Sequence, residues 1–487
     1  MTSLSRQEVW EREVVEVEID DYGFTGEGYV RLSDGWLSVP GALPGERVRV
    51  RLQPGQRRQS HRIYADVEQV IRAAEERRDP LCERDDICRG CQLRHMTVAS
   101  ELAFKVRTVE EVIERYAGVD EEAQPPVDVI TVQPIARGDA YRVRSRLNYK
   151  RQGEAFELGL WSPVKKGLIP MADCPALTGP VQRLIATVEK SLEPGLSLPW
   201  DQAMVDEVKA GVDGIEVDLG VKTIHVVAPT HGVGLVDIEL TESQSEDQFQ
   251  EQLQRELFVD WFKRLSRGVP QKVGLSVSSG GYRRLIKEPE RIRIPVGRWN
   301  LWVGFEDWFH ATLEPAEKVY ETLFEWLALG GDERFLDVGC GIGTISLMAA
   351  DQCQSVHGID RNPSSIEAAE INAVDHGATN IQFHAGGWEK GTRQLVMDER
   401  RFDVATINPM REPLGRRVLA MIDRLGVERL VYLGPAPEAA ARDIGQLREL
   451  GWRLEKLGAA NLHPATYHAM LMAYLTKDDG GKSHEES

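Results

Sequence analysis

The strongest constraint on the fold of this 487-residue chain is a regular alternation of apolar runs and helical segments from residue 305 onward. The apolar runs are FLDVG, VHGID, IQFHA, FDVATI, RLVYLG and AMLMAYL. Strands that alternate with helices pack as a largely parallel sheet with helices on both faces. The pattern therefore predicts a doubly wound, Rossmann-like α/β domain over residues 305–476.

A glycine-rich turn joins the first of these strands to its helix. Glycines let the backbone approach a ligand closely, and the start of the helix offers free N–H groups. Asp360 ends the next strand, where an acid can bind two ribose hydroxyls. A dinucleotide fingerprint would read G-x-G-x-x-G, so this turn favours S-adenosylmethionine over NAD, with a tight turn that binds nothing as the alternative. The turn reads D-x-G-x-G-x-G and consists of Asp337, Gly339, Gly341 and Gly343, followed by Thr344.

The amino-terminal residues 1–72 have a different pattern. Short runs of alternating apolar and polar residues are separated by Gly, Pro and Asp turns, which predicts a small β-barrel. Such barrels bind single-stranded nucleic acid in a charged groove with stacking aromatics, although we expect half of the available aromatics in the barrel core. The available aromatics are Tyr22, Phe24, Tyr29 and Trp36.

The middle of the chain, residues 73–304, is mixed. A helix is expected at residues 100–117, and strands are expected around 141–150 and 156–161. Cys82, Cys88 and Cys91 open this region as C-x5-C-x2-C, and Cys174 follows in MADCPAL. Clustered thiolates in a chain without an export signal point to a metal or cluster rather than to disulfides. Spacing alone slightly favours a zinc site over an iron–sulfur cluster, and a set of thiols that binds no metal is the remaining alternative.

The charge balance limits the partners. A net charge of -18 argues against indiscriminate binding to polyanions, so any RNA contact must come from local patches. Three basic stretches qualify, at residues 49–62, 141–151 and 283–298, and the alternative is that they are solvated sheet faces. No segment has 18 consecutive apolar residues, so we expect a cytoplasmic protein with no membrane contact. We also expect a monomer, and we expect the polar tail at 477–487 to be disordered.

These motifs together resemble the RNA uracil-5-methyltransferases. Residues 1–72 resemble the TRAM domain, an OB-like barrel of RNA-modifying enzymes, and the phrases CRGCQLRHM and CPAL resemble the family's iron–sulfur signature. The resemblance implies an rRNA or tRNA substrate and a 4Fe-4S cluster held by Cys82, Cys88, Cys91 and Cys174. It also implies a mixed α+β central domain and a class I S-adenosylmethionine domain. The residues expected to hold that cofactor are His310, Asp337, Gly339, Gly341, Gly343, Thr344, Asp360 and Asn408.

The chain departs from the family at the two catalytic groups, the nucleophilic cysteine and the carboxylate base. Family members add a cysteine thiolate to carbon 6 of uracil, and a carboxylate then removes the proton from carbon 5. The family's Ser-Cys-Asn-Pro phrase is matched by LGPAPE, which puts Pro435 at the nucleophile and Ala436 at the asparagine. The family's His-x-Glu phrase keeps His468 but has Met470 in place of the acid. No other cysteine is a candidate nucleophile, because Cys340 lies in the glycine turn and Cys353 is expected in the core.

Three functions compete on this evidence. The first is an RNA methyltransferase whose target atom needs no covalent adduct. The family's Asp-Pro-Pro-Arg appears here as Asn408, Pro409, Met410 and Arg411, and an Asn-Pro pair at this place in other methyltransferases binds an exocyclic amino group, although Met410 replaces the usual stacking aromatic. The second is a catalytically inactive RNA-binding paralogue in ribosome or tRNA maturation. The third, family chemistry with a cysteine from elsewhere, ranks last.

Overall fold

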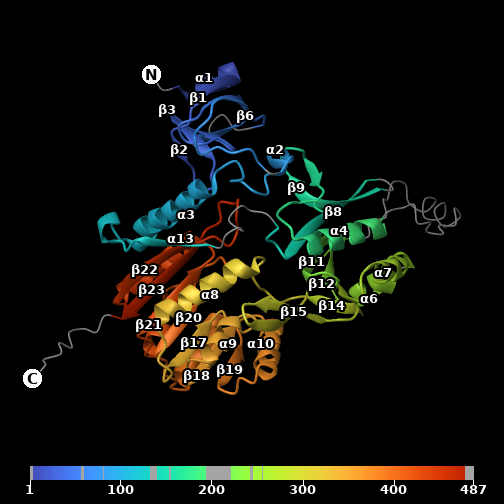
Figure 1. Ribbon diagram of the computed structural model, residues 1–487, viewed down its shortest axis with the longest axis vertical. Helices are drawn as coiled ribbons and strands as arrows, with labels where there is room; N and C mark the ends of the chain where they lie inside the picture. The colour runs from blue at the N-terminus through green and yellow to red at the C-terminus, as the bar shows by residue number, and fades with distance from the viewer. Residues whose placement is uncertain are drawn as a thin grey trace, which may run out of the picture. The chain divides into compact units, whose positions relative to one another are not determined.

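The computed structural model describes residues 4–55, 60–80, 82–131, 140–152, 155–192, 221–241, 245–254 and 256–477 (Figure 1). The chain forms two compact units. One consists of Met1–Gly138 together with Glu314–Ser487, and the other of Asp139–Leu313. The predicted tail at 477–487 lies outside the described residues except for Lys477. No helix within the described ranges is long and apolar enough to cross a membrane.

The amino-terminal sheet has six strands in the order β1-β5-β6-β4-β3-β2. The long strand β6 pairs antiparallel with β5 and parallel with β4, so one strand joins both halves of the sheet and curls it, as the barrel prediction requires. Alternate residues such as Val48, Val50 and Ile63 are fully buried in its core. The elements are α1 (Arg6–Arg12), β1 (Val14–Glu18), β2 (Asp21–Tyr22), β3 (Gly28–Leu32), β4 (Gly35–Val39), β5 (Arg47–Leu52) and β6 (Arg62–Arg72).

The carboxy-terminal sheet has eight strands in the order β19-β18-β17-β20-β21-β23-β22-β7. Its first five strands are parallel and β23 runs antiparallel to both neighbours, which confirms the predicted doubly wound, Rossmann-like domain. The strands are β17 (Arg334–Val338), β18 (Ser355–Asp360), β19 (Ile381–Ala385), β20 (Val404–Ile407), β21 (Arg429–Gly434), β22 (Trp452–Ala460), β23 (Met470–Lys477) and β7 (Val127–Ile130). The helices are α8 (Leu313–Leu327), α9 (Thr344–Ala350), α10 (Pro363–Asp375), α11 (Trp388–Met397), α12 (Arg416–Arg424) and α13 (Pro437–Glu449).

The order of the strands places the candidate site. β17 pairs with β18 on one side and with β20 on the other, so the chain switches direction across the sheet at β17. Ligands of open α/β sheets bind outside the carboxyl ends of the strands at such a switch point. The segments that follow β17, β18, β20 and β21 therefore share the edge where a ligand is expected.

The second unit contains a seven-stranded sheet in the order β10-β9-β8-β11-β12-β13-β14 and a two-stranded sheet of β15 and β16. Apolar side chains from the larger sheet, including Ile224, Val236 and Val277, form one core with residues of α4 and α7. The strands predicted near 141–150 and 156–161 are present as β8 and β9. The elements are β8 (Arg144–Gln152), β9 (Ala155–Ser162), β10 (Gly167–Ile169), α4 (Gly179–Leu192), β11 (Val221–Thr230), β12 (Val233–Leu240), α6 (Glu246–Gln254), α7 (Glu256–Gly268), β13 (Lys272–Ser279), β14 (Tyr282–Lys287), β15 (Arg291–Val296) and β16 (Trp299–Gly304).

A buried ion pair ties the predicted helix at 100–117 to the end of the chain. That helix is present as α3 (Val98–Val112), which continues as η1 (Ile113–Ala117). Lys105 and Glu101 lie one turn apart on α3, are almost completely buried, and are 2.8 Å apart. Lys105 also donates a hydrogen bond to the side chain of Asn461, and Glu101 accepts one from the backbone of Ala465. The loop before β23 is thus held by residues more than 350 positions earlier.

We expect Lys105→Met to lower the free energy of unfolding by about 3–5 kcal/mol, because it leaves the Glu101 carboxylate buried without its cation. Urea titration measures the change. Lys318→Met is the matched control, because Lys318 is exposed beside Glu321 and its loss should cost less than about 1 kcal/mol. Equal effects of the two substitutions would contradict a stabilising role for the buried pair.

Candidate functional site

The glycine turn after β17 needs glycine at three positions. Gly339, Gly341 and Gly343 have φ values of 86°, 53° and 82°, in the left-handed region that side chains rarely adopt. At Gly339 a Cβ atom would also lie 2.3 Å from the backbone oxygen of Asn408. The turn therefore packs directly against the segment that follows β20.

Asp337 fixes the base of this turn from inside. Its carboxylate is fully buried and accepts hydrogen bonds of 2.7 Å from Ser346 on α9 and 2.9 Å from Thr406 on β20. Burial raises the pKa of Asp337 to about 6 in spite of these two hydrogen bonds. The side chain thus holds β17, β20 and α9 together, so its relation to a cofactor would be indirect.

Asp360 ends β18 beside the turn. One carboxylate oxygen accepts a hydrogen bond of 3.0 Å from the backbone N–H of Gly341, and the other accepts one of 2.8 Å from Asn362. The side chain is only partly buried. The predicted ribose-binding acid and the predicted glycine turn are therefore in direct contact, with the acid held in one orientation by two backbone donors.

Asn408 and Pro409 follow β20 at the same edge. The backbone N–H of Asn408 donates a hydrogen bond of 2.8 Å to Val338, which fixes the residue next to the turn. Met410, which directly follows Pro409, is 39% exposed. The loop is held at its far end by Asp443, whose carboxylate accepts hydrogen bonds from the backbone of Leu414 and Gly415.

The position matched to the family nucleophile lies between β21 and α13. Pro435 is partly buried and Ala436 precedes α13 without a side-chain cap. A second proline, Pro437, is the first residue of α13. Because Gly434 pairs with Leu471, the end of β21 and the start of β23 meet at one edge of the sheet.

Met470, at the position matched to the family's acid, is the first residue of β23. It is only 3% exposed, so it is part of the apolar core of the sheet. His468 lies just before it, with its ring 4.2 Å from that of Tyr467. Pro435 and Met470 therefore lie near the same edge of the sheet, and neither carries a thiol or a carboxylate.

The two cysteines of the doubly wound domain are not placed as nucleophiles. Cys340 lies within the glycine turn and is buried, and burial raises the pKa of its thiol well above the usual range. Cys353 follows α9, and burial raises the pKa of its thiol to about 12. Since the thiolate is the reacting form, both groups are held in the unreactive state.

The predicted ligand cysteines divide between the two units. Cys82, Cys88 and Cys91 lie around the short helix α2 (Asp85–Cys88), and Cys174 lies in a turn of the second unit. Burial raises the pKa of the Cys88 thiol, and the neighbouring Cys91 and Cys82 raise it further. Within the described ranges, no group of three or more His, Cys, Asp or Glu side chains is arranged to hold a metal ion.

His310, the predicted cofactor contact, lies in the second unit. It is buried, its ring packs 4.7 Å from that of Trp308, and burial lowers its pKa to about 4. Arg144 on β8 donates a hydrogen bond of 3.1 Å to the backbone of the preceding Phe309. His310 is therefore a neutral side chain on a segment fixed to β8.

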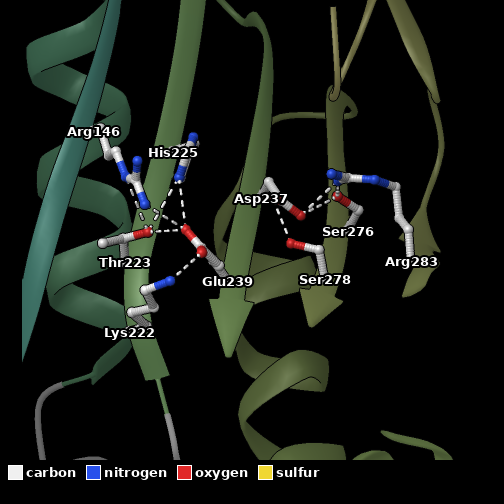
Figure 2. Close-up of polar contacts among 9 residues, drawn as sticks. All are labelled: Arg146, Lys222, Thr223, His225, Asp237, Glu239, Ser276, Ser278 and Arg283. Carbon is white, nitrogen blue, oxygen red and sulfur yellow. Dashed lines mark hydrogen bonds and ion pairs between the residues drawn. The ribbon is translucent and has the colours of Figure 1, made fainter. Parts of the chain in front are cut away.

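Three basic residues of the second unit, Arg146, Lys222 and Arg283, are paired with carboxylates (Figure 2). Glu239 on β12 contacts Arg146 on β8 and Lys222 on β11, both at 2.8 Å. Partial burial raises its pKa, but hydrogen bonds from Lys222 and Thr223 outweigh this and lower the pKa to about 2. The carboxylate is therefore ionised at neutral pH and balances the two cations.

Asp237, two residues earlier on β12, forms the second group in Figure 2. It accepts hydrogen bonds from Ser276 and Ser278 on β13 and pairs with Arg283 on β14 at 2.7 Å. Arg283 also contacts Glu306 at 3.0 Å. These pairs balance the charge of Arg146 and Arg283, one arginine in each of the basic stretches 141–151 and 283–298.

The barrel carries similar pairs but keeps two exposed aromatics. The basic stretch at residues 49–62 lies partly outside the described ranges. In its described part, Arg51 pairs with Glu68 at 2.5 Å. Phe24 and Trp36 are 41% and 39% exposed, whereas Tyr22 packs against Phe104 of α3. Tyr22 and Tyr29 are half-buried, so none of the four expected aromatics is fully buried in the barrel core.

Comparisons with known proteins find similarity to methyltransferases. A profile described as "Methyltransferase domain" matches residues 329–444. An uncharacterized RNA methyltransferase of Thermosynechococcus vestitus is 26% identical over 481 residues, which cover 96% of this chain and 99% of that protein. The 23S rRNA (uracil(1939)-C(5))-methyltransferase RlmD of Vibrio vulnificus is 25% identical over 470 residues, with coverages of 95% and 96%.

Among solved structures, the chain is similar to Pyrococcus abyssi tRNA (uracil-54, C5)-methyltransferase in complex with S-adenosyl-L-homocysteine. The TM-score is 0.64 at 19% identity, and the match covers 95% of this chain and 100% of that one. This similarity confirms the predicted fold class over nearly the whole length of the chain. The predicted family resemblance is confirmed by the relatives that match nearly the whole chain.

Proposed function

We propose that this chain, a divergent relative of the RNA uracil-5-methyltransferases, is an S-adenosylmethionine-dependent RNA methyltransferase. The observation that carries the proposal is the direct contact between the glycine turn and Asp360 at the switch point of the sheet. The relatives that match nearly the full length of the chain are named as RNA methyltransferases, which supports RNA as the substrate. When bound, the cofactor would supply an electrophilic methyl group on sulfur.

The residues at this edge fit such a cofactor. Asp360 is partly exposed, so its carboxyl oxygens can accept hydrogen bonds from two ribose hydroxyls while its orientation is held by Gly341 and Asn362. The left-handed glycines keep side chains out of the space above the turn. Gly339, Gly343, Thr344 and Asn408 remain proposed contacts, and His310 remains one from the second unit.

We expect Asp360→Ala to weaken binding of S-adenosylmethionine by about 10-fold or more, because hydrogen bonds to a charged group contribute roughly 1.5–3 kcal/mol. Isothermal titration calorimetry measures the affinity. Asp332→Ala is the control, because Asp332 is an exposed acid before β17, at the opposite end of the strand. Unchanged affinity in Asp360→Ala would remove this residue from the proposed site.

The covalent route to 5-methyluridine lacks support in this chain. It needs a thiolate and a base, and the matched positions hold Pro435 and Met470. This observation favours a second candidate function, a catalytically inactive paralogue that binds RNA in RNA or ribosome maturation. One assay distinguishes the two candidate functions. Transfer of a labelled methyl group from the cofactor to RNA supports the methyltransferase, and RNA binding without transfer supports the inactive paralogue.

We expect the wild-type protein to form no denaturation-resistant adduct with RNA that contains 5-fluorouracil, because fluorine traps an enzyme only after a thiolate has added to carbon 6. Gel electrophoresis of labelled RNA under denaturing conditions measures the adduct. The double change Pro435→Cys with Met470→Glu should give weak adduct formation at best. It places a carboxylate in a site only 3% exposed, where the ionised form is strongly disfavoured.

A strong adduct with the wild-type protein would mean that another cysteine attacks uracil. In that case the match of Pro435 to the family nucleophile would be wrong. Cys340→Ser and Cys353→Ser would then identify which thiol is responsible.

We also propose that Cys82, Cys88, Cys91 and Cys174 hold a 4Fe-4S cluster, and that residues 1–72 act as a TRAM-like RNA-binding barrel. The position of Cys82, Cys88 and Cys91 around the one short helix α2 supports the first part. The two exposed aromatics Phe24 and Trp36 support the second, because exposed rings can stack on unpaired bases. The cluster would be structural and would tie residue 174 to the segment at 82–91.

We expect protein purified without oxygen to be brown and to contain about four iron and four sulfide per chain, since four thiolates would complete a cubane. Metal analysis and the visible absorption spectrum measure this. Cys174→Ser should lower the iron content, whereas Cys353→Ser, which changes a cysteine outside the set, should not. Colourless protein with one zinc per chain would contradict the proposal.

A further inference from the structure

Two oxygen atoms at the end of β20 have no hydrogen-bond partner within the described residues. They are the side-chain oxygen of Asn408 and the backbone oxygen of Pro409. The backbone of Asn408 is fixed, because its N–H donates to Val338 and its carbonyl lies against Gly339. The edge next to the glycine turn therefore offers acceptors held by a rigid backbone.

An exposed apolar side chain lies next to these acceptors. Met410 is 39% exposed and follows Pro409 directly. A methionine side chain is flexible and polarizable, and it makes favourable contacts with aromatic rings. A planar base that placed a donor at the two oxygens could thus also be covered by Met410.

The chemistry still available at this edge restricts the target atom. Carbon 5 of a pyrimidine becomes nucleophilic only after a thiolate adds to carbon 6, and the position matched to that thiolate is Pro435. The position matched to the base, Met470, is a buried apolar side chain. An exocyclic amine has its own lone pair and needs neither group, but it needs acceptors for its two N–H bonds.

We propose that the target is the exocyclic amino group of an RNA base, an inference that rests on the proposed methyltransferase function. Asn408 and the Pro409 carbonyl accept the two N–H bonds of the amine and direct its lone pair toward the methyl donor. The amine nitrogen forms a bond to the methyl carbon as the bond from that carbon to the sulfonium sulfur breaks. The sulfur leaves as a neutral thioether, and the positively charged nitrogen then loses one proton to water.

The two acceptors also stabilise the reaction electrostatically. Positive charge develops on the amine nitrogen as the new bond forms, and carbonyl dipoles that accept hydrogen bonds from that nitrogen interact more favourably with the charged form. Asn408 is thus a catalytic residue for this reaction, since it contacts the reacting nitrogen. Asp443 is a positioning residue, because it holds the far end of the same loop through Leu414 and Gly415.

The test is methylation of total RNA, taken from cells that lack the gene, with full-length protein and S-adenosylmethionine labelled in the methyl group. Total label in RNA reports whether methyl transfer occurs. Mass spectrometry of the digested nucleosides reports which atom carries the label, and an N-methylated amino nucleoside is the expected product. Label on carbon 5 of a pyrimidine or on ribose would overturn the amine target but leave the methyltransferase function standing. No label in RNA would overturn both.

Variants then test the role of Asn408. We expect Asn408→Ala to lower the rate of methyl transfer about 100-fold, the cost of removing one fixed dipole from a developing charge. The rate is measured at saturating cofactor, because Asn408 is also a proposed cofactor contact, and the melting temperature should stay close to that of the wild type. Asn300→Ala, at an exposed position on β16, is the control and should keep the wild-type rate. Asn408→Ala with full activity would overturn the proposed role of this side chain.

Discussion

The buried carboxylate of Asp337 is the contact on which the site depends. It lies on β17 and accepts hydrogen bonds from Ser346 on α9 and Thr406 on β20, so it joins the three elements that meet at the switch point. Burial raises its pKa from 3.8 to about 6, which means that the folded state holds the proton more tightly than the unfolded chain. The ionised group therefore reduces stability at neutral pH, and this cost is relieved as the pH falls from about 6 to below 4. The packing of Gly339 against Asn408 requires β17 and β20 to stay in register, and Asp337 maintains that register.

The sequence predicted those parts of the site that depend on short-range spacing. The glycine turn and Asn408 directly follow strands with a strong apolar pattern and Asp360 ends one, so their place at one edge of the sheet could be inferred. The direction of the Asp337 side chain could not be inferred, because strand periodicity alone does not tell whether an acid faces a ligand or the core. The buried contacts of Lys105 and Glu101 could not be inferred either, because their partners Asn461 and Ala465 lie more than 350 residues away and no local pattern marks such a contact. The same holds for β7, a strand of four residues that joins the edge of the large sheet.

The charge of the chain has a structural consequence for RNA recognition. Arginines that looked available in the sequence, such as Arg146 and Arg283, are paired with carboxylates on neighbouring strands. An ion pair must be broken or bridged before its cation can bind a phosphate at full strength. With a net charge of -18, long-range attraction to RNA is weak or absent, so recognition must depend on short-range contacts such as stacking and hydrogen bonds. Exposed aromatics like Phe24 and Trp36 serve such contacts without a need for positive charge.

The two positions matched to the family's nucleophile and base lie at one edge of the sheet. Met470 is 3% exposed, so the position matched to the acid is part of the apolar core. Pro435 and Pro437 restrict the backbone between β21 and α13, each with φ fixed near -65° and without an N–H donor. A single reversion at either position would leave a thiol without a base or a base without a thiol, and neither would restore covalent chemistry. After the neighbouring strand β20, the side-chain oxygen of Asn408 and the backbone oxygen of Pro409 have no hydrogen-bond partner in the part of the chain that the structure describes. Under the proposed function, this edge would orient a nucleophile supplied by the substrate and would not create one.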